Sequence, residues 1–96
     1  MSFGLRLKAM IKEERVSQRQ FSEEINFPLT TLEYNIAGRS EPSGALLIKI
    51  GSHEKYRKYA MWLLNGEVQP GTGQVCPSFS ILEQCGLSES ESKKRA

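Results

Sequence analysis

Two short amphipathic segments joined by a tight turn constrain this chain more than any other feature. Ser17 opens a Ser-x-x-Gln capping box, which predicts the start of a short helix. Asn26 tolerates the left-handed conformation that ends a helix, and Pro28 suits the first position of the next one. The second helix is expected over residues 29–37, ended by the glycine that follows. Residues 17–38 therefore predict two short helices packed at a steep angle.

Three further helices are predicted around this pair. Apolar residues recur at helical spacing from residue 3 to 15, from 43 to 51 and, with many aromatics, from 53 to 65. The second of these begins with a serine N-cap, and the third is followed by a glycine stop. The chain is thus expected to be all-α, with five helices.

The composition changes after Gly66. Prolines and glycines exclude a long helix there, while residues 73–76 are expected to form a short strand or hairpin arm. The chain is therefore divided into three parts. These are a five-helix domain over residues 1–66, a C-terminal arm over residues 67–82, and a disordered Ser/Glu/Lys-rich tail over residues 83–96.

Charge is distributed unevenly along the chain. The first 66 residues hold ten Lys/Arg and seven Asp/Glu, a net charge of +3. The remainder holds three and four, a net charge of −1, which gives the +2 of the whole chain. The predicted domain is therefore the more basic part, which suits a partner that carries phosphates.

Several classes of protein are not expected. No run approaches the roughly 20 apolar residues of a membrane span, and no secretory signal is evident, so a cytoplasmic location is predicted. Cys76 and Cys85 are expected to be free thiols outside the core, and His53 has no partner at metal-ligand spacing. No catalytic arrangement of side chains occurs. Neither an enzyme, a cofactor, a metal nor a small-molecule substrate is predicted.

The second helix of the pair is the predicted DNA-reading element. Two short helices in this geometry push the second one outward, where it can enter the major groove of duplex DNA. Its threonines can bond base edges, Glu33 can accept from a cytosine amino group, and Leu29 or Tyr34 can meet a thymine methyl. Residues before and after it lie beside the phosphates. The predicted DNA-binding residues are Gln18, Arg19, Leu29, Thr30, Thr31, Glu33, Tyr34, Arg39 and Ser40.

Two alternatives remain open at this point. Two short helices with a turn also occur in helical bundles that never contact DNA. An outward face that holds Leu29 and Tyr34 beside polar groups equally suits a protein-binding patch. The second class is therefore a helical protein-interaction module, such as an antitoxin or an anti-repressor.

Several short motifs occur together along the chain. Residues 6–51 open with Arg-Leu-Lys and carry Ser-Gln-x-x-Phe-Ser and then Gly-Arg-Ser-x-Pro. Residues 58–64 read Lys-Tyr-Ala-Met-Trp-Leu-Leu, and residues 68–77 read Val-x-Pro-x-x-Gly-Gln-Val-x-Pro. The first set resembles the phage-repressor and Cro-like helix-turn-helix superfamily. The second is similar to the short immunity repressors of temperate bacteriophages of the P-two group.

This resemblance implies a homodimer of lambda-repressor-like five-helix subunits with a C-terminal β arm. It implies binding to a double-stranded operator with directly repeated half-sites in a bacterial host. The expected activity is repression of the phage early lytic promoter, which maintains lysogeny. Apolar residues in excess of what a small core needs are the predicted dimer contacts. They are Trp62, Leu64, Val68, Val75 and Phe79.

The chain departs from the superfamily pattern at three positions. Asn26 stands at the usual turn glycine, and Ser22 at the small residue of the first motif helix. Ile36 stands where the superfamily commonly has a glutamate, so an ion pair from Arg6 to that position is not expected. We expect the last departure to remove one stabilising contact and to leave the fold unchanged.

Overall fold

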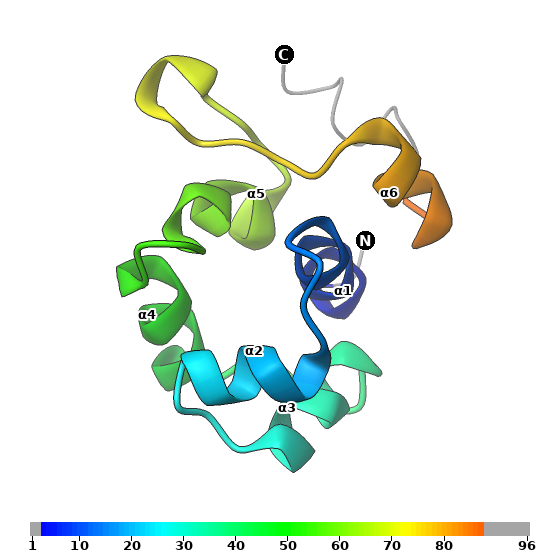
Figure 1. Ribbon diagram of the computed structural model, residues 1–96, viewed down its shortest axis with the longest axis vertical. Coiled ribbons are helices and arrows are strands. Elements are labelled where there is room, and N and C mark those ends of the chain that lie inside the picture. The colour runs from blue at the N-terminus through cyan, green and yellow to red at the C-terminus, as the bar shows by residue number, and fades with distance from the viewer. Residues whose placement is uncertain (1–2, 88–96) are drawn as a thin grey trace.

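The computed structural model describes residues 3–87, and that part of the chain is helical (Figure 1). It holds six α-helices and two short 3₁₀ helices but no strand, so the predicted all-α class is confirmed. None of its helices is long and apolar enough to cross a membrane. The elements are α1 (Phe3–Glu13), α2 (Gln18–Glu24), α3 (Leu29–Ile36), α4 (Gly44–Ser52), η1 (Arg57–Tyr59), α5 (Ala60–Asn65), η2 (Pro70–Thr72) and α6 (Phe79–Gln84).

Helix α1 packs against α3, α5 and α6, while α2 packs on α3 below it in the view of Figure 1. The closest approach lies at Gly4, near the start of α1. A Cβ atom there would lie 2.5 Å from the carbonyl oxygens of both Asn35 and Ile36, at the end of α3. The two helices therefore meet backbone to backbone, and this contact fixes the position of α3.

A single apolar core forms where the predicted helical faces meet. Leu7, Phe21 and Leu32, from the first three helices, are completely buried. The aromatic segment after α4 supplies further large side chains to this core. The largest fully buried side chains are Trp62, Tyr56, Phe21, Leu7, Met10, Leu32, Leu46, Ile50 and Leu63.

The segment over residues 53–65 does not form the single helix that its sequence predicts. The His53 side chain accepts a hydrogen bond from the Lys55 N–H at 3.1 Å, and a turn begins there. η1 and then α5 follow. In a 3₁₀ helix, side chains three residues apart are eclipsed. Tyr56 and Tyr59 are thus aligned, and their hydroxyls reach Glu24 and Glu14 on other helices.

The predicted β arm is also different from the structure. Residues 66–77 form a loop around η2, with one isolated antiparallel bridge between Gln69 and Gln74. The Val75 N–H donates to the Lys58 carbonyl at 2.8 Å, and the Gln74 side chain accepts from the Met61 N–H at 2.9 Å. These bonds tie the segment to η1 and α5 of its own chain, so it does not extend as a strand.

Helix α6 was not predicted, and it belongs to the main core. Leu82, Cys85 and Leu87 are buried in the same cluster as the residues of α1. The prediction that disorder begins at residue 83 is therefore wrong for residues 83–87, and the prediction that Cys85 lies outside the core is wrong too. The rest of the predicted tail lies outside the described residues.

Candidate nucleic-acid interface

The start of α2 has the predicted cap. The Gln20 N–H donates to the Ser17 hydroxyl at 2.9 Å, which satisfies one of the free amides of the first turn. The Gln20 side chain does not return the bond, because its amide donates forward to Glu24 at 3.4 Å. Half of the predicted capping box is thus confirmed. Of the two predicted contact residues here, Arg19 is exposed and Gln18 is half-buried.

The turn between α2 and α3 follows the prediction closely. Asn26 has the left-handed conformation, with φ of 56°, and the Phe27 N–H donates to the Ser22 carbonyl at 2.9 Å. Pro28 lies one position earlier than expected, since it is the N-cap of α3 rather than its first helical residue. Its carbonyl accepts from the Leu32 N–H at 3.0 Å, so it still begins the helix.

Four of the five residues predicted to face outward from α3 do so. Thr30, Thr31, Glu33 and Tyr34 are exposed, with 49% of Tyr34 accessible. Leu29 is different, because it is half-buried and packs against the core. Leu29 therefore packs mainly inward and supports the start of α3.

Asn35 is a residue of this site that sequence reasoning missed. Its side chain is buried, and its amide donates to the Ser40 hydroxyl at 2.8 Å, the Ser40 carbonyl at 3.2 Å and the Glu41 carbonyl at 3.3 Å. These bonds hold the loop that carries the exposed predicted contacts Arg39 and Ser40. A polar residue three positions after the inward Leu32 was the available signal, because that spacing also points inward.

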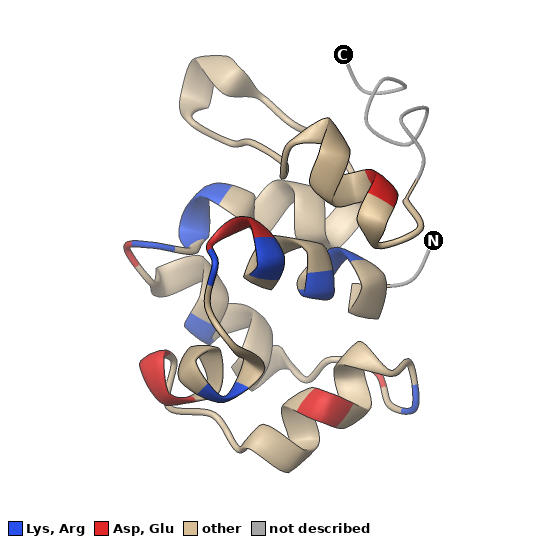
Figure 2. Ribbon diagram, turned by 45° about the vertical axis from the view of Figure 1, so that its right-hand side comes forward, with Lys and Arg blue, Asp and Glu red and all other residues tan. Residues whose placement is uncertain are grey.

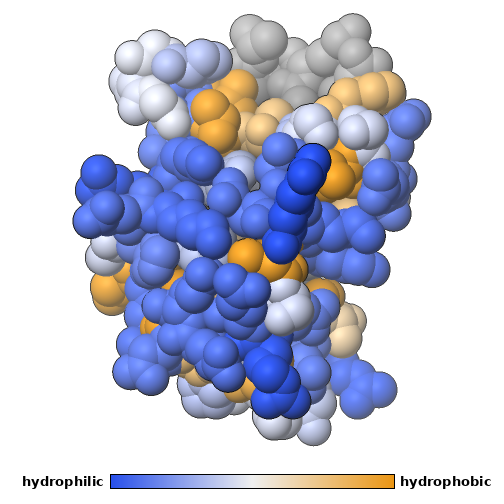
Figure 3. Space-filling view, viewed as in Figure 1, coloured by the Kyte–Doolittle hydropathy of each residue, from blue (hydrophilic) through white to orange (hydrophobic). Residues whose placement is uncertain are grey.

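The charge of α3 is unusual for an element expected to meet phosphates. Its sequence, Leu-Thr-Thr-Leu-Glu-Tyr-Asn-Ile, has one acidic residue and no basic one. In Figure 2, the coloured part of this helix is red, while blue segments lie on α1 and at the start of α2. In Figure 3, hydrophilic side chains cover most of the visible surface over α2 and α3. Attraction to a polyanion therefore has to come from neighbouring elements.

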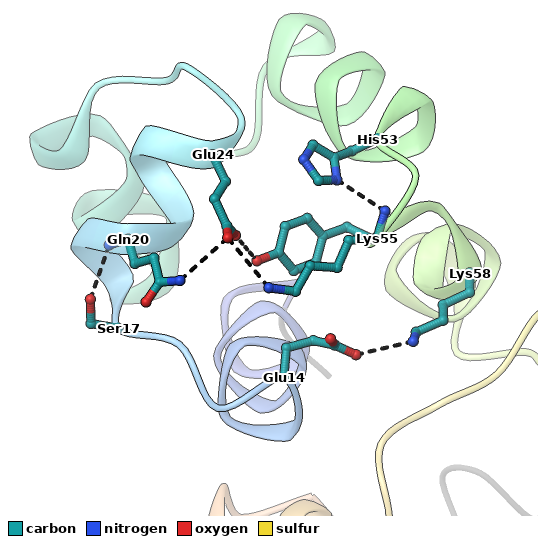
Figure 4. Close-up of polar contacts among 8 residues, drawn as sticks. Glu14, Ser17, Gln20, Glu24, His53, Lys55 and Lys58 are labelled. Atoms are coloured by element: carbon teal, nitrogen blue, oxygen red, sulfur yellow. Dashed lines mark hydrogen bonds and ion pairs between the residues drawn. The ribbon is translucent and has the colours of Figure 1, made fainter.

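Glu24 holds the end of α2 in place. Figure 4 shows its carboxylate facing Gln20 of the same helix and Lys55 of the later turn. It accepts from the Tyr56 hydroxyl and forms an ion pair with Lys55 at 3.3 Å. The hydrogen bond from Tyr56 lowers the pKa of Glu24 below its ordinary 4.5, against the opposing effect of burial. Burial, followed by the bond to Glu24, raises the pKa of Tyr56.

A second pair of this kind holds the end of α1. The Tyr59 hydroxyl donates to Glu14 at 2.5 Å. Lys58 pairs with the same carboxylate at 3.2 Å, as Figure 4 shows. Burial is the main cause that raises the pKa of Tyr59, and the hydrogen bond to Glu14 adds to it. The two pairs fix η1 against α1 and α2, so the short helices of the site stand on a rigid base.

Arg6 finds another partner in place of the ion pair that Ile36 excludes. It is buried in α1, and its Nε donates to the carbonyl oxygen of Leu63 at 3.0 Å. Leu63 is at the same time one of the fully buried core residues of α5. This bond therefore ties α1 to the end of α5.

The predicted dimer residues differ in how far they are exposed. Trp62 is only 2% exposed, so its assignment to a dimer contact is corrected: it belongs to the chain's own core. Val68 and Val75 are half-buried and pack against that core. Leu64 and Phe79 remain available, with 59% and 49% of their surfaces exposed.

Comparison with known proteins places the chain in no family. No protein-family model matches it, and no curated protein is significantly similar. Within residues 3–87, no three His, Cys, Asp or Glu side chains gather in an arrangement suited to a metal ion. The ligand of this site therefore has to be inferred from the shape, exposure and charge of the α2–α3 pair.

Proposed function

We propose that the chain is a sequence-specific DNA-binding repressor in which α3 enters the major groove. The observation that carries this proposal is the exposed face of α3, formed by Thr30, Thr31, Glu33 and Tyr34 on a helix held by a tight turn. The major groove, about 12 Å wide, admits one α-helix. Hydroxyl, carboxylate and aromatic groups match the donors, acceptors and thymine methyls that each base pair presents there.

The flanking residues support the same orientation. Arg19 is exposed in the first turn of α2, where free backbone amides and a basic side chain suit a phosphate. Arg39 and Ser40 are exposed just after α3, in the loop that Asn35 holds. Phosphate contacts on both sides of α3 would fix its register in the groove while α3 itself reads the bases.

The proposed class within DNA-binding proteins is the phage immunity repressor with a lambda-repressor-like fold. Support comes from the motifs of residues 6–51 and 58–77 and from the order of five helices before Gly66. In this proposal two copies bind one operator and silence an early lytic promoter. The exposed Leu64 and Phe79 are the apolar groups left for contact between copies.

Selection of duplexes from random DNA tests both parts of the proposal. We expect the chain to recover a defined sequence with two half-sites, because each copy reads one. Tyr34→Ala should reduce affinity for the selected site by about tenfold, since one base contact is worth roughly 1–3 kcal/mol. It should leave the affinity for random duplex unchanged. The measurement is fluorescence anisotropy with labelled duplexes at fixed salt.

Ile48→Ala is the matched control, because Ile48 is 68% exposed on α4, outside the proposed interface. It should bind both duplexes as the wild type does. Recovery of a single half-site would contradict the dimer but keep the DNA-binding function. Recovery of no preferred sequence at low salt would contradict the function and favour a protein-interaction module.

A further inference from the structure

Four helices of the described chain end in the same way, and one of them uses an unexpected residue. At each end a residue with positive φ is followed by an N–H that donates five residues back, as Val16 does to Ile11 at 3.4 Å. Two of the four positive-φ residues are glycines, and one is an asparagine. The fourth is Arg15, with φ of 60°. The four positions are Arg15, Asn26, Gly38 and Gly86.

Arginine is poorly suited to this position. Glycine has no Cβ to clash in the left-handed region and asparagine tolerates it, whereas a long side chain pays a steric cost. The Arg15 side chain does not offset that cost, because it is exposed and its guanidinium makes no ion pair within residues 3–87. Strained residues are retained where they serve a function, so this outlier indicates a role for the charge at this place.

Arg15 lies within a strip of basic side chains. Lys8 and Lys12 are exposed on α1 one turn apart, and Arg19 is exposed at the start of α2. Figure 2 shows blue segments on α1, in the α1–α2 loop and at the start of α2, with one red segment between them at the end of α1. Like Arg15, these three residues form no ion pair within the described part of the chain. The basic strip is Lys8, Lys12, Arg15 and Arg19.

No nearby carboxylate forms an ion pair with the basic strip within residues 3–87, although Glu23 lies exposed one turn after Arg19. The other three are engaged elsewhere. Glu13 accepts from the Ser78 N–H at 2.8 Å. Glu14 is bonded to Tyr59 and Lys58 of η1. Glu24 is bonded to Tyr56 and Lys55 of the preceding turn. The positive charge of the strip is therefore free to attract an external anion.

We propose that the basic strip binds the phosphate backbone of duplex DNA beside the groove that α3 enters. The inference rests on the proposed function and deepens it, because it supplies the positive charge that α3 lacks. Arg19 joins the two surfaces, since it belongs both to the strip and to the predicted contacts at the start of α2. The strip extends the DNA contact beyond the helix-turn-helix, along α1.

Arg15→Gly separates folding from binding, because its two expected effects have opposite signs. Glycine removes the steric cost at φ of 60°, so the melting temperature should rise by about 4 °C. The affinity for a random-sequence 30-base-pair duplex should fall. The slope of log K against log salt should shrink by about 0.9, the value for one lost phosphate contact.

A triple variant, Lys8→Gln/Lys12→Gln/Arg15→Gly, enlarges the effect. The slope should shrink by about 2.7. Between 50 and 200 mM salt, the triple variant's loss of affinity should therefore be roughly fortyfold smaller than the loss of the wild type. Lys49→Gln is the matched control, because it removes one lysine from α4 and should leave the slope unchanged. An unchanged slope in Arg15→Gly and in the triple variant, with melting temperatures no lower than that of the wild type, would overturn the proposal.

Two further outcomes distinguish this proposal from the proposed function. A preferred sequence that depends on Tyr34, together with unchanged slopes in the strip variants, would reject the strip alone. Strip-dependent binding to random duplex without any preferred sequence would keep the strip and reject sequence-specific reading by α3. Binding to vesicles of anionic lipid, with no binding to duplex at 50 mM salt, would reject both and assign the strip to a membrane surface.

Discussion

The two parts of this chain reach their structures by different routes. From Phe3 to Ser52, helices begin and end at residues suited to those places, such as the caps Ser17 and Ser43, with Arg15 as the exception. From His53 to Leu87, the backbone is set by contacts with the first part, as the 3₁₀ turn beneath Tyr56 and Tyr59 shows. Local chemistry therefore sets where the helices of the first part begin and end, whereas the backbone of the second part depends on its packing partners.

Gly4→Ala tests the tertiary contact that places the locally specified helices of the first part against each other, and we expect it to have the largest effect. The new Cβ would lie 2.5 Å from two backbone carbonyl oxygens of α3, so a helix has to move. Overpacking of this kind costs about 3 kcal/mol, at the upper end of the usual range. Urea unfolding should show the loss as a lower midpoint.

Gly51→Ala is the control for that experiment. Gly51 lies within α4, and a Cβ there would meet nothing within 4 Å. Alanine should therefore stabilise the protein by about 0.5–1 kcal/mol through helix propensity alone. If both variants shifted the midpoint in the same direction, the close contact between α1 and α3 would not exist in solution.

Tyr59→Phe tests the second part, where long-range contacts are expected to dominate. The substitution keeps the buried ring and removes the hydroxyl that donates to Glu14. A hydrogen bond to a charged group contributes about 1.5–3 kcal/mol, so the free energy of unfolding should fall by roughly 2 kcal/mol. Tyr34→Phe is the matched control, because that hydroxyl is on an exposed residue and should contribute nothing.

The pH dependence of unfolding gives a second measurement of the buried Tyr59 hydroxyl, whose pKa is raised by burial and then by the bond to Glu14. The pKa values of Tyr56 and Tyr59 are raised in the folded state above the ordinary 10.0, so both keep their protons longer than in the unfolded chain. Their contribution is complete below pH 10 and is lost as the pH rises through the folded-state pKa. Stability should therefore decline above pH 10, and less steeply in Tyr59→Phe. Equal slopes would mean that neither burial nor Glu14 keeps the Tyr59 hydroxyl protonated in the folded state.

These contacts also explain how much of the fold the sequence could predict. Asn26 and Gly38 mark helix ends by residue type alone, and both were predicted. The bond between Tyr56 and Glu24 joins residues 32 positions apart, and that between Tyr59 and Glu14 spans 45. No local pattern specifies such a pairing, so the aromatic segment was predicted as one continuous helix.

The candidate site divides in the same way. Helical periodicity alone predicts that Thr30, Thr31 and Tyr34 face outward, and the structure places them there. Periodicity does not show which outward position also packs against the core at a helix start, so it did not predict that Leu29 is half-buried. Nor does it show where the Asn35 amide finds its acceptors, because these lie in a loop with no regular spacing.

Substitutions at the helix N-caps are expected to have the smallest effect on stability. They compare the two parts of the chain at single residues. Ser17 and Ser43 accept from the N–H three residues on, at 2.9 and 3.2 Å, whereas Ser78 at the start of α6 makes no such bond. Replacing either of the first two by alanine should cost about 1 kcal/mol. Ser78→Ala should cost close to nothing, because the hydroxyl it removes caps no N–H of α6 and contacts only the exposed Ser80 hydroxyl, at 3.4 Å. Thermal unfolding of the three variants measures this order. A loss in Ser78→Ala equal to the others would show that α6 begins by the same local rule as α2 and α4, and the contrast between the two parts would then end before α6.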